Sequence, residues 1–177
     1  MSETRSQIHA NQSAKWGTPG KDLGMICATI GSDYHDPCPS DWQPGDPDGA
    51  TIDNVLIGQS VYINHPGGRG QFEKWWEFAK VLLSMHSSDV VWCAFRAEQI
   101  RLMMPDLINI GGWLIYPDKR IHYIWIGETN EKNTYGEPGK SPANYSFFWS
   151  SVEPKGVPDG YIVMKVGADN AGGCLRG

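Results

Sequence analysis

The feature that most constrains the fold of this chain is an alternation of strand-like and helix-like segments in its middle. Ser60 to Ile63 and Asp89 to Phe95 are short and largely apolar runs, as is typical of buried strands. Gln71 to Met85 repeats apolar residues at helical spacing, and Ala97 to Met104 predicts a short helix that ends before Pro105. Such alternation predicts an α/β fold, with a mostly parallel sheet and helices on its faces.

The second half of the chain contains strand-like segments that no helical segment separates. Arg120 to Ile126 and Asn144 to Ser151 are such segments, and we expect them to pair as a long antiparallel hairpin. The loop between them, Gly127 to Pro142, is charged and should project from the sheet. Tyr161 to Val166 is expected to add an edge strand. A mostly parallel sheet that ends in an antiparallel hairpin is the layout of the methyltransferase variant of the Rossmann fold, which is therefore the predicted architecture.

The beginning of the chain differs in character from the rest. Residues 1–15 are polar and aperiodic, which predicts a flexible arm, whereas residues 16–177 have the size of a single domain. An N-cap threonine followed by a proline predicts a helix over residues 18–30. Residues 32–36 predict a brief strand, and the proline-rich residues 37–49 predict an irregular loop.

Composition excludes several classes of protein. The net charge of −5 argues against a protein that coats nucleic acid non-specifically, since that affinity comes largely from neutralised phosphates. No apolar run is long enough to cross a bilayer and no signal peptide precedes the domain, so we expect a cytoplasmic protein without membrane contact. The four cysteines, Cys27, Cys38, Cys93 and Cys174, lack metal-ligand spacing, which predicts reduced thiols and no metal site.

A candidate site lies where the first buried strand ends. Val61 to Ile63 runs directly into Asn64, His65 and a proline-restrained, glycine-rich turn. Ligands of open α/β sheets bind at such strand ends. The Asn64 side chain and a backbone carbonyl beside it are the acceptors needed to hold an exocyclic amino group. The alternative interpretation is a tight strand-to-helix turn in which the glycines only relieve backbone strain.

Four sequence pieces occur in the same order as in a known family. They are Trp16-Gly17-Thr18-Pro19; Asp36-Pro37-Cys38-Pro39-Ser40 with Asp48-Gly49; Val61-Tyr62-Ile63-Asn64-His65-Pro66-Gly67-Gly68; and Phe95-Arg96-Ala97-Glu98-Gln99 with Arg120-Ile121-His122-Tyr123-Ile124 and Ala143-Asn144. Over roughly residues 16–151 the chain resembles the phage-type Dam family of DNA adenine methyltransferases. The third piece is similar to that family's Asn-Pro-Pro-Gly-Gly motif.

The resemblance implies a reaction, a cofactor and a set of site residues. It implies transfer of a methyl group from S-adenosylmethionine to the amino group of an adenine that is flipped out of DNA, in a phage or prophage protein in the bacterial cytoplasm. The implied catalytic residues are Asn64, His65 (through its carbonyl) and Pro66. The implied cofactor-binding residues are Trp16, Thr18, Pro19, Asp36 and Pro37, with Asp36 accepting the ribose hydroxyls. The implied substrate-binding residues are Gly67, Gly68, Arg69 and Tyr135.

Two departures from the family motif leave an alternative function open. His65 occupies the position of the first proline of the motif, and Gly67 occupies the position that is most often aromatic. Trp42, Trp75 or Tyr135 would then have to supply the stacking surface for the flipped base. The alternative is a catalytically inactive binding protein of methyltransferase fold, which acts on a phage or host protein partner.

Overall fold

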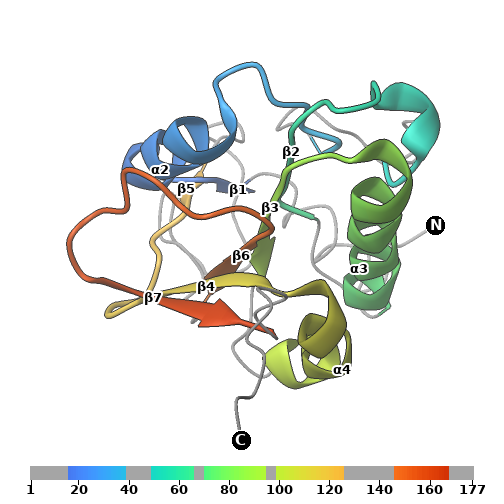
Figure 1. Ribbon diagram of the computed structural model, residues 1–177. Helices are drawn as coiled ribbons and strands as arrows, with labels where there is room; N and C mark the ends of the chain where they lie inside the picture. Colours follow the sequence, from blue (N-terminus) through green and yellow to red (C-terminus); the bar gives the residue numbers. More distant parts are fainter. Residues whose placement is uncertain (1–15, 39–48, 66–69, 95–98, 126–145, 168–177) are drawn as a thin grey trace, which may run out of the picture.

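The protein is seen here in a computed structural model, which describes residues 16–38, 49–65, 70–94, 99–125 and 146–167 (Figure 1). The helical elements are α2 (Gly20–Ile30), the 3-10 turn η1 (Ile52–Asn54), α3 (Gln71–Val81), the π-helical turn η2 (Leu82–His86) and α4 (Ile100–Ile110). The strands are β1 (Trp16–Gly17), β2 (Val61–Ile63), β3 (Val90–Ala94), β4 (Gly112–Pro117), β5 (Ile124–Trp125), β6 (Phe147–Ser150) and β7 (Tyr161–Val166).

The main sheet is mixed and has the strand order β2-β3-β6-β4-β7. β2 and β3 are parallel, whereas β6 runs antiparallel between β3 and β4, and β7 runs antiparallel along β4. The predicted α/β class is confirmed. A mostly parallel sheet is not confirmed, because one of these four pairings is parallel and three are antiparallel. The reason is the insertion of β6: β2, β3 and β4 point the same way, but β6 separates β3 from β4.

The predicted hairpin between Arg120–Ile126 and Asn144–Ser151 is wrong. β5 pairs instead with β1 in a separate two-stranded sheet, with Trp16 opposite Trp125. β6 lies between β3 and β4 and is antiparallel to both, and β4 is a strand that the sequence analysis did not predict. The antiparallel pair at the edge of the sheet is β4 with β7. The edge strand over Tyr161–Val166 is confirmed.

Helix α4 continues through Pro105, so the prediction that it ends before this proline is wrong. Pro105 and Arg101 are both exposed, and water can therefore reach the Arg101 carbonyl that the proline leaves without an intrahelical donor. The helix ends at Gly111, which takes a positive φ of 73° and donates its backbone N–H to the Leu107 carbonyl. Glycine is the residue that accepts this conformation without strain.

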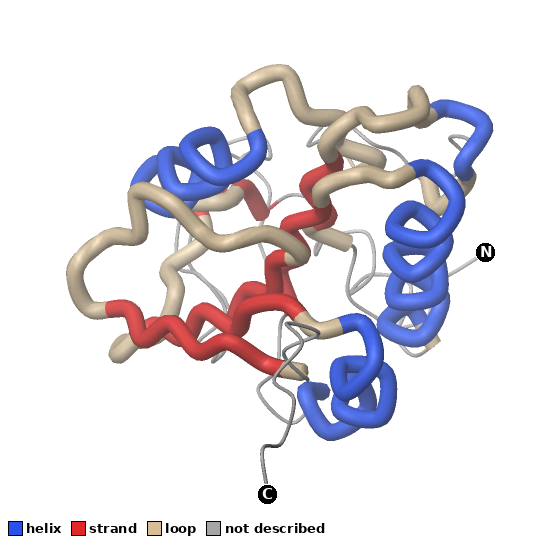
Figure 2. The backbone as a smooth tube through the Cα atoms, in the orientation of Figure 1, coloured by secondary structure: helices blue, strands red, loops and turns tan. Residues whose placement is uncertain are grey.

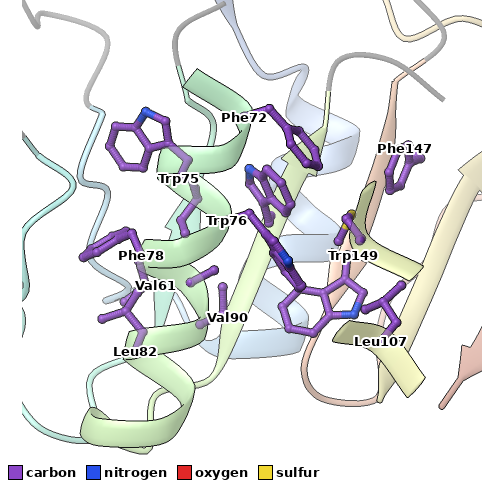
Figure 3. Close-up of a cluster of buried hydrophobic side chains, with 14 of the residues drawn as sticks. Val61, Phe72, Trp75, Trp76, Phe78, Leu82, Val90, Leu107, Phe147 and Trp149 are labelled. Carbon is purple, nitrogen blue, oxygen red and sulfur yellow. The ribbon is translucent and has the colours of Figure 1, made fainter. Parts of the chain in front are cut away.

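Helices cover both faces of the sheet, as Figure 2 shows with strands in the middle and helices around them. α3 and α4 cover one face, where Trp76 meets Trp149 edge-on with ring centroids 5.3 Å apart (Figure 3). On the same face Trp76 stacks on Trp92 with ring centroids 5.2 Å apart. α2 covers the other face with Met25, Ile26 and Ile30. The two faces alternate along β2, so Val61 and Ile63 enter the first cluster and Tyr62 the second.

Other expectations have mixed outcomes. Residues 71–81 form the expected amphipathic helix, which passes into the π-helical turn η2 and ends at Ser87, where φ is 53°. The brief strand predicted over residues 32–36 reduces to one parallel bridge between His35 and Val61. Residues 1–15 lie outside the described residues. Among the described residues, no helix combines the length and apolar character needed to span a membrane.

Candidate functional site

Three segments that are distant in sequence meet at the carboxyl end of β2. Asn64 follows directly after the strand. His35 lies beside β2. Its backbone N–H donates to the Ser60 carbonyl, and its carbonyl accepts from the Tyr62 N–H. Thr18, in the short link between β1 and α2, contacts Tyr62 and Asn64. Carboxyl ends of parallel strands are where α/β folds bind ligands.

The centre of this site is a pair of hydrogen bonds at Thr18. Thr18 Oγ1 lies 2.7 Å from the Tyr62 hydroxyl, and Asn64 Nδ2 donates to Thr18 Oγ1 over 3.4 Å. Thr18 and Tyr62 are both buried, and burial raises the pKa of Tyr62 well above its usual range. The phenol therefore stays protonated at any physiological pH.

The side-chain oxygen of Asn64 is the open group of the site. Asn64 Oδ1 is buried and has no hydrogen-bond partner among the residues that the structure describes. Buried polar atoms of native proteins are nearly always hydrogen-bonded, so such an atom is a reason to expect a ligand. An amide oxygen is purely an acceptor, and the ligand group that satisfies it must be an N–H or O–H donor.

His65 points into the protein core. Its side chain is 2 % exposed and stacks on Trp75 with ring centroids 6.3 Å apart, while Trp92 lies 5.6 Å away. A proline at this position would restrain the backbone, because its ring includes the backbone nitrogen. In this chain the packing of the His65 side chain against two indoles restrains the residue instead. The backbone carbonyl of His65 is therefore attached to a well-packed side chain.

Trp75 is not available as a stacking surface for a base. It is 3 % exposed and packs against His65 and Phe78, so the expectation that it replaces the missing aromatic residue of the motif is wrong. The sequence also favours this burial, because Trp75 lies with Phe72 and Leu82 on the apolar face of the predicted helix. The other two aromatic residues considered, Trp42 and Tyr135, lie outside the described residues.

Asp36 lies at the same edge of the sheet, immediately after His35. Its Oδ1 accepts a hydrogen bond from the Cys38 backbone N–H over 2.9 Å, which closes a turn at the buried Pro37. The carboxylate is half-buried. The structure thus places Asp36 directly after His35, which pairs with β2 at Val61, while Thr18 contacts Asn64; the joint role predicted for these three residues stays a prediction.

The N-terminal pieces are arranged differently from the prediction. The helix expected from Thr18 begins at Gly20, with Pro19 as its N-cap residue and no side-chain cap. The Thr18 hydroxyl contacts Tyr62 instead, and the Pro19 carbonyl accepts from the N–H groups of Asp22 and Leu23. Trp16 lies in β1, opposite Trp125. The remaining predicted site residues, Pro66, Gly67, Gly68, Arg69 and Tyr135, lie outside the described residues.

A buried polar network behind the site was missed in the sequence. Cys93 Sγ lies 3.0 Å from the Tyr123 hydroxyl, and both side chains are buried in the cluster that also contains Tyr62. Burial raises the pKa of Cys93 to about 12, so this thiol is protonated and unreactive. The sequence signal that could have revealed this network is a tyrosine or a cysteine within a strand whose other residues are apolar. Among the described residues, no cluster of three or more His, Cys, Asp or Glu side chains is placed to hold a metal ion.

Comparison with known proteins adds no assignment: no family model matches the chain, and no curated protein and no solved structure matches it either.

Proposed function

We propose that the protein is an S-adenosylmethionine-dependent DNA adenine methyltransferase of the phage Dam-like type. The observation that carries the proposal is the hydrogen bonding of the Asn64 side-chain amide. Its nitrogen is held by Thr18, from the Trp-x-Thr-Pro-like piece, and its oxygen is buried without a partner among the described residues. Two motif pieces, whose contacting residues are 46 positions apart in the sequence, therefore hold one hydrogen-bond acceptor in place.

The sheet supports this proposal. β2 and β3 are parallel, and β4 and β6 form an antiparallel pair at the end of the parallel part. A parallel pair of strands beside antiparallel strands is compatible with the proposed methyltransferase fold, although the predicted mostly parallel sheet is not what the chain forms. β7 then extends the sheet as an additional antiparallel edge strand.

The residues fit the needs of the reaction. An adenine amino group is a weak nucleophile because its lone pair is delocalised into the ring, so orientation must supply much of the rate. Asn64 Oδ1 accepts one amino hydrogen and the His65 carbonyl accepts the other, which turns the nitrogen lone pair towards the electrophile. Bound S-adenosylmethionine supplies that electrophilic methyl group. The Asp36 carboxylate is the acceptor that ribose hydroxyls of such a cofactor require.

A transfer assay tests the proposal. The full chain is incubated with unmethylated DNA and S-adenosylmethionine labelled in its methyl group, beside Asn64→Ala as the inactive variant. We expect label in DNA with the wild type and a loss of at least about 100-fold with Asn64→Ala, since the positioned acceptor is removed. Tyr34→Phe is the matched control, because Tyr34 packs edge-on against Tyr62 at 5.7 Å, and its substitution leaves the side chains of Thr18 and Asn64 and the contact between them in place. Wild-type protein that transfers no label contradicts the proposal.

A second candidate is a methyltransferase-fold binding protein without turnover, which acts on a phage or host protein partner. The observations in its favour are the burial of Trp75, which removes one stacking surface, and the net charge of −5. A stacking partner contributes roughly 1–3 kcal/mol per base. Calorimetry separates the candidates: binding of S-adenosylmethionine without any transfer to DNA supports the binding protein, and no binding argues against both.

A further inference from the structure

We propose that the outer edge of β7 is a dimer interface, at which two copies of this chain pair their β7 strands antiparallel about a two-fold axis and join their sheets into one. The inference does not depend on the proposed function. Edge strands offer backbone groups to another strand, and proteins normally block them with a proline, a bulge or charges. β7 is six residues long, contains no proline and pairs with β4 without a bulge.

The hydrogen-bonding phase of β7 shows which backbone groups face outwards. The Asp118 N–H donates to the Gly160 carbonyl over 2.7 Å, and these two residues continue the register of β4 with β7. Residues of an antiparallel ladder alternate between hydrogen-bonded and non-hydrogen-bonded pairs. The even-numbered residues of β7 therefore bond β4, whereas the N–H and C=O groups of Tyr161 and Val163 point away from it. Among the described residues, β4 is the one strand that pairs with β7.

A two-fold axis through Val163 brings these outward groups together. Val163 then faces Val163 of the partner subunit, and the two residues exchange a pair of hydrogen bonds. Ile162 lies opposite the partner's Met164 at a non-hydrogen-bonded position, where the side chains of antiparallel strands are closest. The pairing therefore matches apolar residues with apolar residues at its centre.

The side chains at the centre of β7 are exposed on both faces of the sheet. Ile162 is 60 % exposed, Val163 37 % and Met164 44 %. Val163 alternates with the other two along the strand, so it lies on the opposite face. Pairing with a second copy would remove apolar surface from water on both faces at once.

Helix α4 extends this apolar surface. It lies beside β7 at the lower edge of the molecule in Figure 1, and Val166 packs in the cluster that contains Leu107. The exposed large hydrophobic residues of α4 are Leu102, Met104, Ile108 and Ile110. Together with the three of β7 they make seven of the eleven such residues in the described part of the chain. Two copies expose an area on the order of 1,000 Å² through these side chains, which is about the least that a specific interface buries.

The charges at the two ends of β7 complement each other in an antiparallel dimer. The strand contains one charged residue, Lys165, near its end. Its beginning is acidic, because Asp159 lies two residues before it and a side chain at Gly160 would meet the carboxylate of Asp118. The two-fold axis places Lys165 opposite the partner's Tyr161, and so at the acidic beginning of the partner strand. The lysine thereby favours an identical strand over other partners.

Substitution at the two-fold axis tests the pairing, because each chain meets its own copy there. Analytical ultracentrifugation of the full chain over a wide range of concentration measures the dimer. We expect the wild type to dimerise and Val163→Lys to weaken the dimer at least about tenfold, since two like charges replace an apolar pair. Val163→Asp should do the same. An equimolar mixture of the two variants should dimerise again, because opposite charges then face each other.

Leu56→Lys is the matched control, because Leu56 is an exposed apolar residue outside α4 and β7. This variant should dimerise like the wild type, and circular dichroism shows whether each variant is folded. A wild type that stays monomeric overturns the proposal. So does a dimer that survives Val163→Lys, or one that Leu56→Lys dissociates.

Amide hydrogen exchange of the wild type tests the interface without any substitution. On dilution of the dimer, the Val163 N–H should lose at least about tenfold of its protection, because it bonds only the second copy. The N–H groups of Ile162 and Met164, which bond β4, should keep theirs. Protection of Val163 that does not change with concentration overturns the proposal.

Discussion

The buried carboxyl of Asp22 shows how a charged side chain is accommodated beneath α2. Asp22 has no exposed surface, its Oδ1 accepts a hydrogen bond from the Tyr161 hydroxyl, and Lys21 lies 5.0 Å from the centre of the Tyr161 ring. Burial raises the pKa of Asp22, although the hydrogen bond from Tyr161 and the charge of Lys21 oppose the shift. The folded protein therefore favours the neutral carboxyl more strongly than the unfolded chain does.

This shift predicts that stability falls with rising pH. The protonated Asp22 stabilises the fold fully below the unfolded-state pKa of about 3.9, and this contribution is lost as pH rises through the higher folded-state pKa. The loss is about 1.4 kcal/mol for each unit by which folding raises the pKa. Urea denaturation between pH 4 and pH 8 measures it by comparing the wild type with Asp22→Asn, which has no titrating group at this position. Identical pH dependence in the two proteins contradicts the prediction.

At the residue scale, the sequence pattern pointed to Asn64, and the structure shows that this residue follows directly after β2 and contacts Thr18. Asn64 was recognisable because an apolar strand stops there, and Thr18 and Asp36 through the order of motif pieces. The burial of Trp75 follows from its place on the apolar face of its helix, whereas the burial of His65 could not be predicted, because an imidazole after a strand has exposed and buried orientations. Packing chooses between these orientations, and packing depends on β3, which is distant in the sequence.

At the element scale, local periodicity predicted some elements and failed for others. α3, β2, β3 and β7 follow their own sequence patterns. β4 was not recognised because Pro105 suggested that the preceding helix ended early, and β5 was assigned to the wrong partner. A strand's own sequence does not specify which other strand it pairs with, since that choice depends on contacts with distant segments. Ile121 and Tyr123, read as strand residues, are instead buried under α2 outside any strand.

The proline within α4 predicts a stabilising substitution. Pro105→Ala supplies the missing N–H and removes the ring that crowds the Arg101 carbonyl, at the cost of a more flexible unfolded chain. We expect a net gain of about 1–2 kcal/mol in the free energy of unfolding. Asn109→Ala, also exposed in α4, is the control and should gain only about 0.5 kcal/mol from helix propensity. Urea denaturation measures both changes.

Loss of stability in Pro105→Ala would show that the proline has a positive role. The next residue, Asp106, accepts a hydrogen bond from Trp76 Nε1 over 2.7 Å and pairs with Lys80 at 3.1 Å. If α4 needs the proline to bring Asp106 close to α3, Pro105→Ala would lose both of these contacts.

At the scale of the whole molecule, one sheet separates two hydrophobic clusters. The stacked tryptophans Trp76 and Trp92 belong to the cluster under α3 and α4, and Ile26 belongs to the cluster under α2. Neighbouring residues of the same strands serve both clusters. The clusters should therefore unfold together.

Ile26→Ala tests this coupling. Truncation of this fully buried side chain is expected to destabilise the protein by about 2–5 kcal/mol. The near-ultraviolet circular dichroism, to which the four tryptophans of the opposite cluster contribute, should shift to the same lower urea midpoint as the far-ultraviolet signal. Leu107→Ala, in the tryptophan cluster, provides the comparison. A tryptophan signal that keeps its wild-type midpoint in Ile26→Ala would show that the faces unfold separately.

The position of β6 in the middle of the sheet has a consequence for synthesis on the ribosome. β6 is the sixth strand in chain order, yet it joins β3 to β4. Until Phe147–Ser150 leaves the exit tunnel, both of those strands present open edges, and open edges of folding intermediates promote aggregation. We therefore expect a nascent chain that is stalled before residue 146 to bind chaperones more readily than one stalled after β7 has emerged.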